Sequence, residues 1–139
     1  MSVAELIIAP DPVDLVVTEL TTGVGQRPGF EGVRAGGSVP IPRPRRFVRV
    51  RSVGGAQNSV VHLTPTVVVE AYADTDGDAA ALGWLCHAIM LAAGRNLSMG
   101  GSPCSDVGVF ALPQDLPDPT TDQARSTATY AVSLRGVVA

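Results

Sequence analysis

The sequence predicts an α+β fold, an antiparallel β-sheet of about four strands with two helices packed on one face. Two observations lead to this prediction. The expected elements follow in the order helix, hairpin, helix, hairpin, and the hairpin segments alternate apolar and polar residues with the period of a strand. The 139 residues fit one domain, 1–139, that can bury a core without a disulfide or a metal.

The first helix is predicted over about residues 12–21. Asp11 is a favourable N-cap, Pro12 suits the first helical position, and Asp14 places a negative charge near the positive end of the helix. Residues 6–8 before it are compatible with either a strand or a helical lead-in.

Residues 22–44 are predicted to form a flexible loop or arm. Glycines and prolines are frequent there, although residues 30–35 could form a short strand. The alternating prolines of residues 39–44 require extended backbone and exclude a central position in a sheet. We therefore expect this arm to pack along a sheet edge or onto another subunit.

A β-hairpin is predicted next, with strands from about residue 45 and over residues 60–73, joined by a Gly-rich turn. Phe47, Arg49 and Arg51 should point to one face and the residues between them to the other. Glu70 lies in the Val-rich second strand. It could be catalytic, but a position facing an arginine is the interpretation we favour.

The main helix is predicted over about residues 76–93, with acidic residues at its start and Gly94 at its end. One face is lined by Leu82, Leu85, Cys86, Ile89 and Ala93, and a second by Trp84, Ala88 and Leu91. A helix that is apolar all round is buried on more than one side. One side should meet the sheet, and we expect Trp84 and Leu91 to meet a neighbouring copy.

The last third of the chain is predicted to hold the second hairpin. Residues 96–105 are rich in Gly and Ser and are expected to form a loop, followed by a strand over 107–112. Residues 113–119 form a rigid acidic turn, and a final strand covers residues 123–137.

No arrangement of residues predicts catalysis or cofactor binding. Neither His62 nor His87 has a second metal-ligating residue at suitable spacing. Residues 74–78 are acidic like a calcium loop, but Gly77 comes too early, so helix capping explains them better. We therefore expect a protein that is not an enzyme and that has no cofactor and no metal.

The cysteines and the apolar segments lead us to expect a protein made in the cytoplasm without membrane contact. Cys86 lies in the apolar helix and is expected to be buried, and a disulfide with Cys104 is not expected. Residues 1–5 lack the basic region of a signal peptide, and no stretch is expected to span a bilayer.

Arginine is unevenly distributed along the chain. All ten basic residues are arginines, and six lie between Arg34 and Arg51, although the net charge is −3. The densest group is Arg43, Arg45, Arg46, Arg49 and Arg51. These side chains could contact phosphates or acidic protein patches, or they could form a solvated strand face. If the chain forms a ring, Asp115 and Asp118 of one copy are natural partners for the arginines of the next.

Three stretches resemble the tail terminator proteins of long-tailed actinobacteriophages, which are similar to the phage lambda tail terminator family. The run from Val39 to Arg51, followed by Gly54 and Gly55, resembles the extended arm and first long strand of that family. Residues 67–73 leading into 79–93, and residues 123–130, resemble its strand-to-helix passage and its final strand.

The resemblance implies a virion structural protein of the tail neck region. In that family a hexameric ring caps the tail tube, stops tail polymerisation and binds the head-side connector, and the double-stranded DNA genome passes through the lumen without sequence recognition. Another head–tail joining protein, a stopper or adaptor, is the main alternative. A DNA-binding module is disfavoured by the net charge of −3 and the scarcity of aromatic residues near the arginines.

Overall fold

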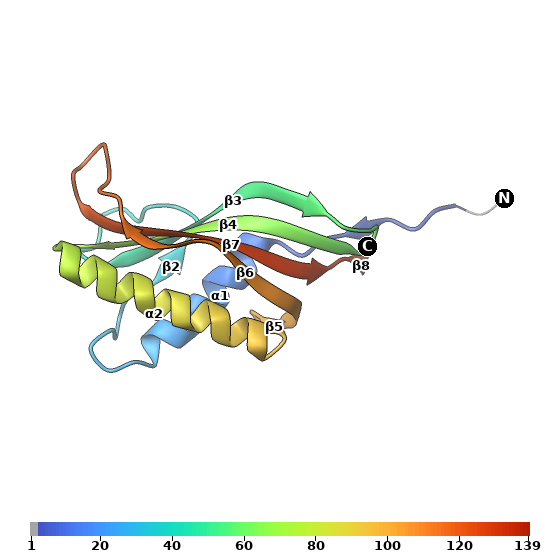
Figure 1. Ribbon diagram of the computed structural model, residues 1–139, viewed down its shortest axis with the longest axis horizontal. Coiled ribbons are helices and arrows are strands. Elements are labelled where there is room, and N and C mark those ends of the chain that lie inside the picture. The colour runs from blue at the N-terminus through green and yellow to red at the C-terminus, as the bar shows by residue number, and fades with distance from the viewer. Residues whose placement is uncertain (1–2) are drawn as a thin grey trace.

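The computed structural model describes residues 3–139, which fold into a curved sheet covered on one face by two helices (Figure 1). The predicted α+β class is confirmed. The elements are β1 Ile7–Ile8, α1 Pro12–Gly25, β2 Ala35–Gly36, β3 Phe47–Gln57, β4 His62–Ala73, α2 Asp76–Arg95, β5 Ser98–Met99, β6 Ser102–Asp115, β7 Ala124–Arg135 and β8 Val137–Val138.

The main sheet has six strands in the order β2-β3-β4-β7-β6-β5, so the prediction of about four strands is wrong. The sheet is also mixed, because β2 runs parallel to β3 while the other pairs are antiparallel. The short strand considered over residues 30–35 overlaps β2 only at Ala35, and β5 was not predicted; each of these strands has two residues. Such short pairings depend on which segments the fold brings together, and no local pattern marks them. A separate antiparallel pair, β1 and β8, joins the two ends of the chain.

Helix α1 begins as predicted and ends later than predicted. The Asp11 carboxylate accepts a hydrogen bond from the Val13 N–H at 2.9 Å, which caps the first turn. The helix passes the expected end at Thr21 and continues to Gly25. Gly23 lets α1 pass close to α2 because it has no side chain. A Cβ at that position would lie only 2.8 Å from Ile89 of α2. Close packing between the two helices therefore outweighs the local preference of glycine for a turn.

Helix α2 lies along the sheet and is capped by Thr75, whose hydroxyl accepts a hydrogen bond from the Asp78 N–H at 3.2 Å. Gly94 brings it close to β6, since a Cβ there would lie 3.2 Å from Val107. By length and composition α2 could also cross a membrane, contrary to our expectation that no stretch would. Burial of Leu82 and other residues against the sheet explains its apolar character within this domain.

Strand β6 is longer than predicted. Residues 96–105 were expected to form a loop, but β5 ends at Met99, and Gly100 and Gly101, both with positive φ, turn the chain back into β6. Three irregularities in the register between β6 and β7 interrupt its alternation, which explains why only the segment near Val107 showed a strand pattern.

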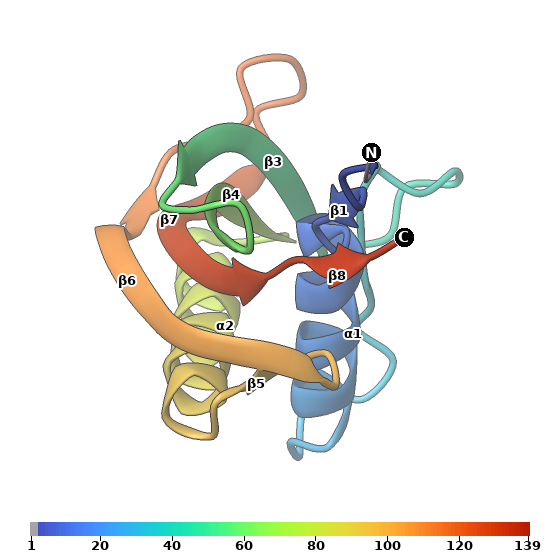
Figure 2. The same ribbon diagram turned by 90° about the vertical axis from the view of Figure 1, so that its right-hand side faces the viewer.

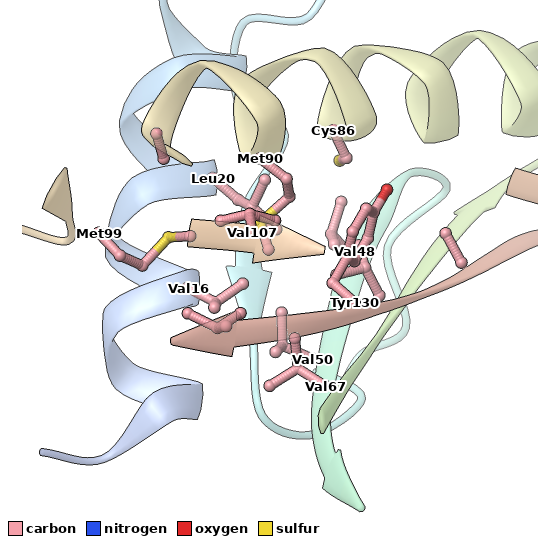
Figure 3. Packing of buried hydrophobic residues seen from close by; sticks show 14 of the residues in the cluster. Val16, Leu20, Val48, Val50, Val67, Cys86, Met90, Met99, Val107 and Tyr130 are labelled. Atoms are coloured by element: carbon pink, nitrogen blue, oxygen red, sulfur yellow. The ribbon is translucent and has the colours of Figure 1, made fainter. Parts of the chain in front are cut away.

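The core lies between the helices and the concave face of the sheet (Figures 2 and 3). Helices α1 and α2 meet β3, β4, β6 and β7 in one buried cluster, in which Tyr130 is the largest side chain. The cluster includes Val16, Leu20, Val48, Val50, Val67, Val69, Cys86, Met90, Met99, Val107, Tyr130 and Val132. Residues that alternate with these along β3, β4 and β7 point to the convex face.

Candidate interaction surfaces

The convex face of the sheet carries a pair of stacked aromatic rings, which lie under Arg43 of the arm formed by residues 22–44. Phe47 and Tyr72 are both buried, with ring centroids 4.4 Å apart and planes 10° apart. The Arg43 guanidinium lies 5.2 Å from the Tyr72 centroid, within cation–π range. Arg43 also donates to Asp118 at 2.9 Å and to Gln123 at 2.5 Å. The arm therefore folds back over its own sheet.

The next two arginines are also engaged within the chain. Arg45 pairs with Asp74 at 2.6 Å, but its side chain is 87% exposed, so solvent screens the pair. Arg46 donates to the Gly29 carbonyl at 3.0 Å and lies over the Phe30 ring. Arg45 thus fastens the segment between α1 and β3 to the loop before α2, and Arg46 joins two parts of that segment to each other.

A buried carboxylate lies among three guanidiniums in the middle of the convex face. We call Glu70, Arg49, Arg51 and Arg125 the Glu70 cluster. The Glu70 side chain is 2% exposed, and Arg125 and Arg51 donate to its two oxygens at 2.9 and 3.2 Å. Arg49, its direct cross-strand neighbour, lies 4.0 Å away. The expectation that Glu70 faces an arginine is confirmed.

Asp118 lies at the edge of this face, and Asp115 lies at the end of β6. The Thr120 N–H, which donates to Asp118 at 2.9 Å, lowers the pKa of that carboxyl, and Arg43 lowers it further. Asp115 is exposed and pairs in register with Ser126. The pairing of Arg43 with Asp118, which we expected between copies, is thus formed within one chain.

The second apolar face of α2 is open at Trp84 and closed at Leu91. Trp84 is 49% exposed, and Ala88, one turn later, is also exposed. Leu91 is only partly exposed and packs against the core. Leu91 is therefore less available to a partner than Trp84, and the expectation that both meet a neighbouring copy stays a prediction.

Strand β6, which packs against α2, also exposes apolar side chains. Val109, Phe110 and Leu112 are 39%, 69% and 56% exposed. The strand lies beside α2, and Pro113 is close enough that a Cβ on Gly83 would lie 3.7 Å from its ring. We call Trp84, Ala88, Val109, Phe110 and Leu112 the α2–β6 surface. Sequence alternation alone could not reveal its β6 part, because the bulges of β6 change which residues face outward.

Beneath Trp84, a histidine of α2 and a tyrosine of β7 form a hydrogen bond with each other. His87 Nδ1 and the Tyr130 hydroxyl form a hydrogen bond of 2.9 Å, and the Trp84 ring meets His87 edge-on. Burial lowers the pKa of His87 and raises that of Tyr130. A neutral imidazole that bonds a neutral phenol supports packing of the core beneath α2.

The two cysteines are free, and both are buried. Burial raises the pKa of Cys86 to about 12 and also raises that of Cys104, so neither thiol is activated. Within residues 3–139, no group of three or more His, Cys, Asp or Glu side chains could hold a metal ion. His62 is exposed and bonds the Ser59 hydroxyl at 3.1 Å.

Neither a protein-family model nor a curated protein sequence matches this chain.

Proposed function

We propose that this protein is a structural subunit that assembles with copies of itself into a ring, and that the ring caps the tail tube of a long-tailed phage. In this role it terminates tail polymerisation and joins the tail to the head-side connector. The genome passes through the ring without sequence recognition. The proposal is that of a tail terminator, with a hexamer as the expected ring.

The α2–β6 surface is the observation that carries this proposal. Its helix part holds a half-exposed tryptophan, its strand part exposes Phe110 and Leu112, and no charged residue occurs in α2 between Asp78 and Arg95. Aromatic side chains in an uncharged setting are typical of the centre of a protein interface. A second copy covering this surface would remove about 25 cal/mol of unfavourable hydration for each Å² of apolar area.

The two edges of the sheet support a ring over a simple dimer. β6 has β5 beside it only at its first residues, and on the opposite side β2 covers β3 only at Val48 and Arg49. The two edges differ in sequence and in shape, so a contact between them would be heterologous. Repeated heterologous contacts close into rings, whereas a dimer with a twofold axis uses one surface twice.

The arginines favour a structural role over the alternative of a DNA-binding module. Arg43, Arg45 and Arg51 each contact a carboxylate of the same chain. A duplex would have to compete with those carboxylates for the guanidiniums. The surface thus lacks the row of free cations that a phosphate backbone requires.

The test measures tail tube polymerisation in the presence of the purified protein. We expect the wild-type protein to bind tube ends and to arrest their growth. Phe110→Glu should abolish arrest, while Val138→Glu, a charge placed at a similarly exposed position on β8, should not. If the wild-type protein does not associate with tube ends, the terminator role is wrong. Binding to the head-side connector without arrest of the tube would instead identify a stopper or adaptor.

A further inference from the structure

The Glu70 cluster lies beneath an open depression on the convex face. The depression has a volume of about 420 Å³ and is walled by Val39 of the arm and by the loop from Asp118 to Thr121. Arg49 and Arg51, whose side chains are 36% and 42% exposed, line it together with Glu70. The cationic groups are therefore reachable from solvent, while the carboxylate beneath them is not.

The cluster contains more positive than negative charge. Three guanidiniums surround one carboxylate, which gives the cluster a net charge of +2. Arg43 does not alter this balance, because Asp118 neutralises it. The strongest contacts of Glu70 are with Arg125 and Arg51, so Arg49 is the guanidinium whose charge is least compensated.

Two buried polar atoms in the cluster lack partners. The Nε of Arg49 is buried without a hydrogen-bond acceptor, and so is the hydroxyl of Thr127, which lies directly across from Glu70 on β7. Buried polar groups are nearly always hydrogen-bonded, so the unpaired Nε shows that Arg49 is not fully satisfied within the chain, while its side chain is 36% exposed in the depression. An anionic acceptor that reached the exposed part of Arg49 would also offset the excess positive charge.

We propose that this depression binds a carboxylate side chain from an acidic polypeptide segment of a partner protein. The carboxylate would accept hydrogen bonds from Arg49 and Arg51, for which the planar guanidinium fork is well suited. The 420 Å³ depression has room for a side chain and its backbone, which exceeds what a single small ion would occupy.

The rim of the depression favours a polypeptide over a nucleic acid. Asp118 stands at its edge, and the loop continues to exposed Asp122. A duplex, with one charge per about 1.7 Å of its axis, would bring further phosphates against these carboxylates. Phe47 and Tyr72, which could stack on bases, are buried. A single acidic side chain can enter between the rim carboxylates, whereas a continuous line of phosphates cannot.

The test is fluorescence anisotropy with a labelled oligoglutamate peptide, using an oligoglutamine peptide of the same length as the matched ligand control. We expect wild-type protein to bind oligoglutamate and not oligoglutamine. Arg49→Gln should weaken binding at least about tenfold. Arg135→Gln, which removes the same charge from an exposed position outside the depression, should leave binding unchanged. Arg49→Lys keeps the charge and should restore only part of the affinity.

Three results would overturn the proposal. The first is that oligoglutamate does not bind, the second is that Arg135→Gln and Arg49→Gln weaken its binding equally, and the third is that duplex DNA displaces the labelled peptide as well as unlabelled peptide does. The thermal unfolding of each variant is measured alongside, and Arg51→Gln provides a second test if Arg49→Gln does not fold. This binding does not depend on ring assembly, so its outcome can be separated from that of the tube assay.

Discussion

The two faces of the sheet are built by opposite means. The concave face is apolar and is sealed by α1 and α2, with Leu20 and Tyr130 fully buried. The convex face buries aromatic rings and a carboxylate under arginines, and is covered by the arm and the loop after β6. The concave face is complete within one chain, whereas the convex face retains unpaired groups. We infer that folding depends mainly on the first face, and that the second face contributes a binding site for a partner in addition to the α2–β6 surface.

The largest expected effect on stability comes from truncating a core side chain that packs on the concave face. Leu20→Ala should lower the free energy of unfolding by about 3 kcal/mol, because the side chain is fully buried and the neighbouring helix cannot close the cavity. Chemical denaturation measures this change. Leu6→Ala, at a position that is 73% exposed, is the matched control and should cost little. Equal effects would show that the core does not lie where the structure places it.

The next largest effect should come from the convex face. Glu70→Gln should destabilise the fold by about 2 kcal/mol, since three guanidiniums lose their shared counter-charge. Combining it with Arg125→Gln should recover part of this loss, which a double-mutant cycle in denaturant measures. Simple additivity of the two substitutions would mean that the Glu70 cluster does not act as a unit.

A smaller effect is expected at the histidine beneath the α2–β6 surface. Burial lowers the pKa of His87 below its ordinary value, so the unfolded chain takes up a proton more readily than the folded one. Stability should therefore fall as the pH drops through about 6.5. The melting temperature of His87→Gln should fall less over the same range. A constant difference between the two proteins would argue against a buried neutral imidazole.

The smallest effect on folding is expected at Trp84. Trp84→Ala removes a half-exposed side chain and should change the free energy of unfolding by less than about 1 kcal/mol. The same substitution should nevertheless weaken self-association, which light scattering over a range of concentrations measures. If it instead unfolds the protein, the α2–β6 surface belongs to the core.

Local signals predicted the parts of this fold that depend on local structure. Asp11 and Pro12 fixed the start of α1, and the acidic residues near Asp76 fixed the start of α2. The predicted end of α1 at Thr21 was wrong. Gly23 looks like a helix-breaking residue in the sequence, and its packing against Ile89 is visible only in the fold. Contacts between distant segments are not encoded in a local pattern.

The candidate sites were also predicted only where their residues lie close together in the sequence. The alternation of Arg49 and Arg51, and the isolated charge of Glu70 among valines, indicated an arginine partner for Glu70. The contribution of Arg125 was missed, because it depends on the register between β4 and β7. The second apolar face of α2 was predicted, but the contact of Leu91 with the core was not, since it depends on packing between distant segments.

Trp84 is the only tryptophan in the chain, so its fluorescence reports directly on the α2–β6 surface. The most direct test of the ring proposal compares its emission and its quenching by acrylamide in the free, dilute protein and in protein bound to tail tubes. If neighbouring copies cover this surface, emission shifts to shorter wavelength and quenching falls on binding. Unchanged emission and quenching in tube-bound protein would contradict the proposal that copies of this chain meet there.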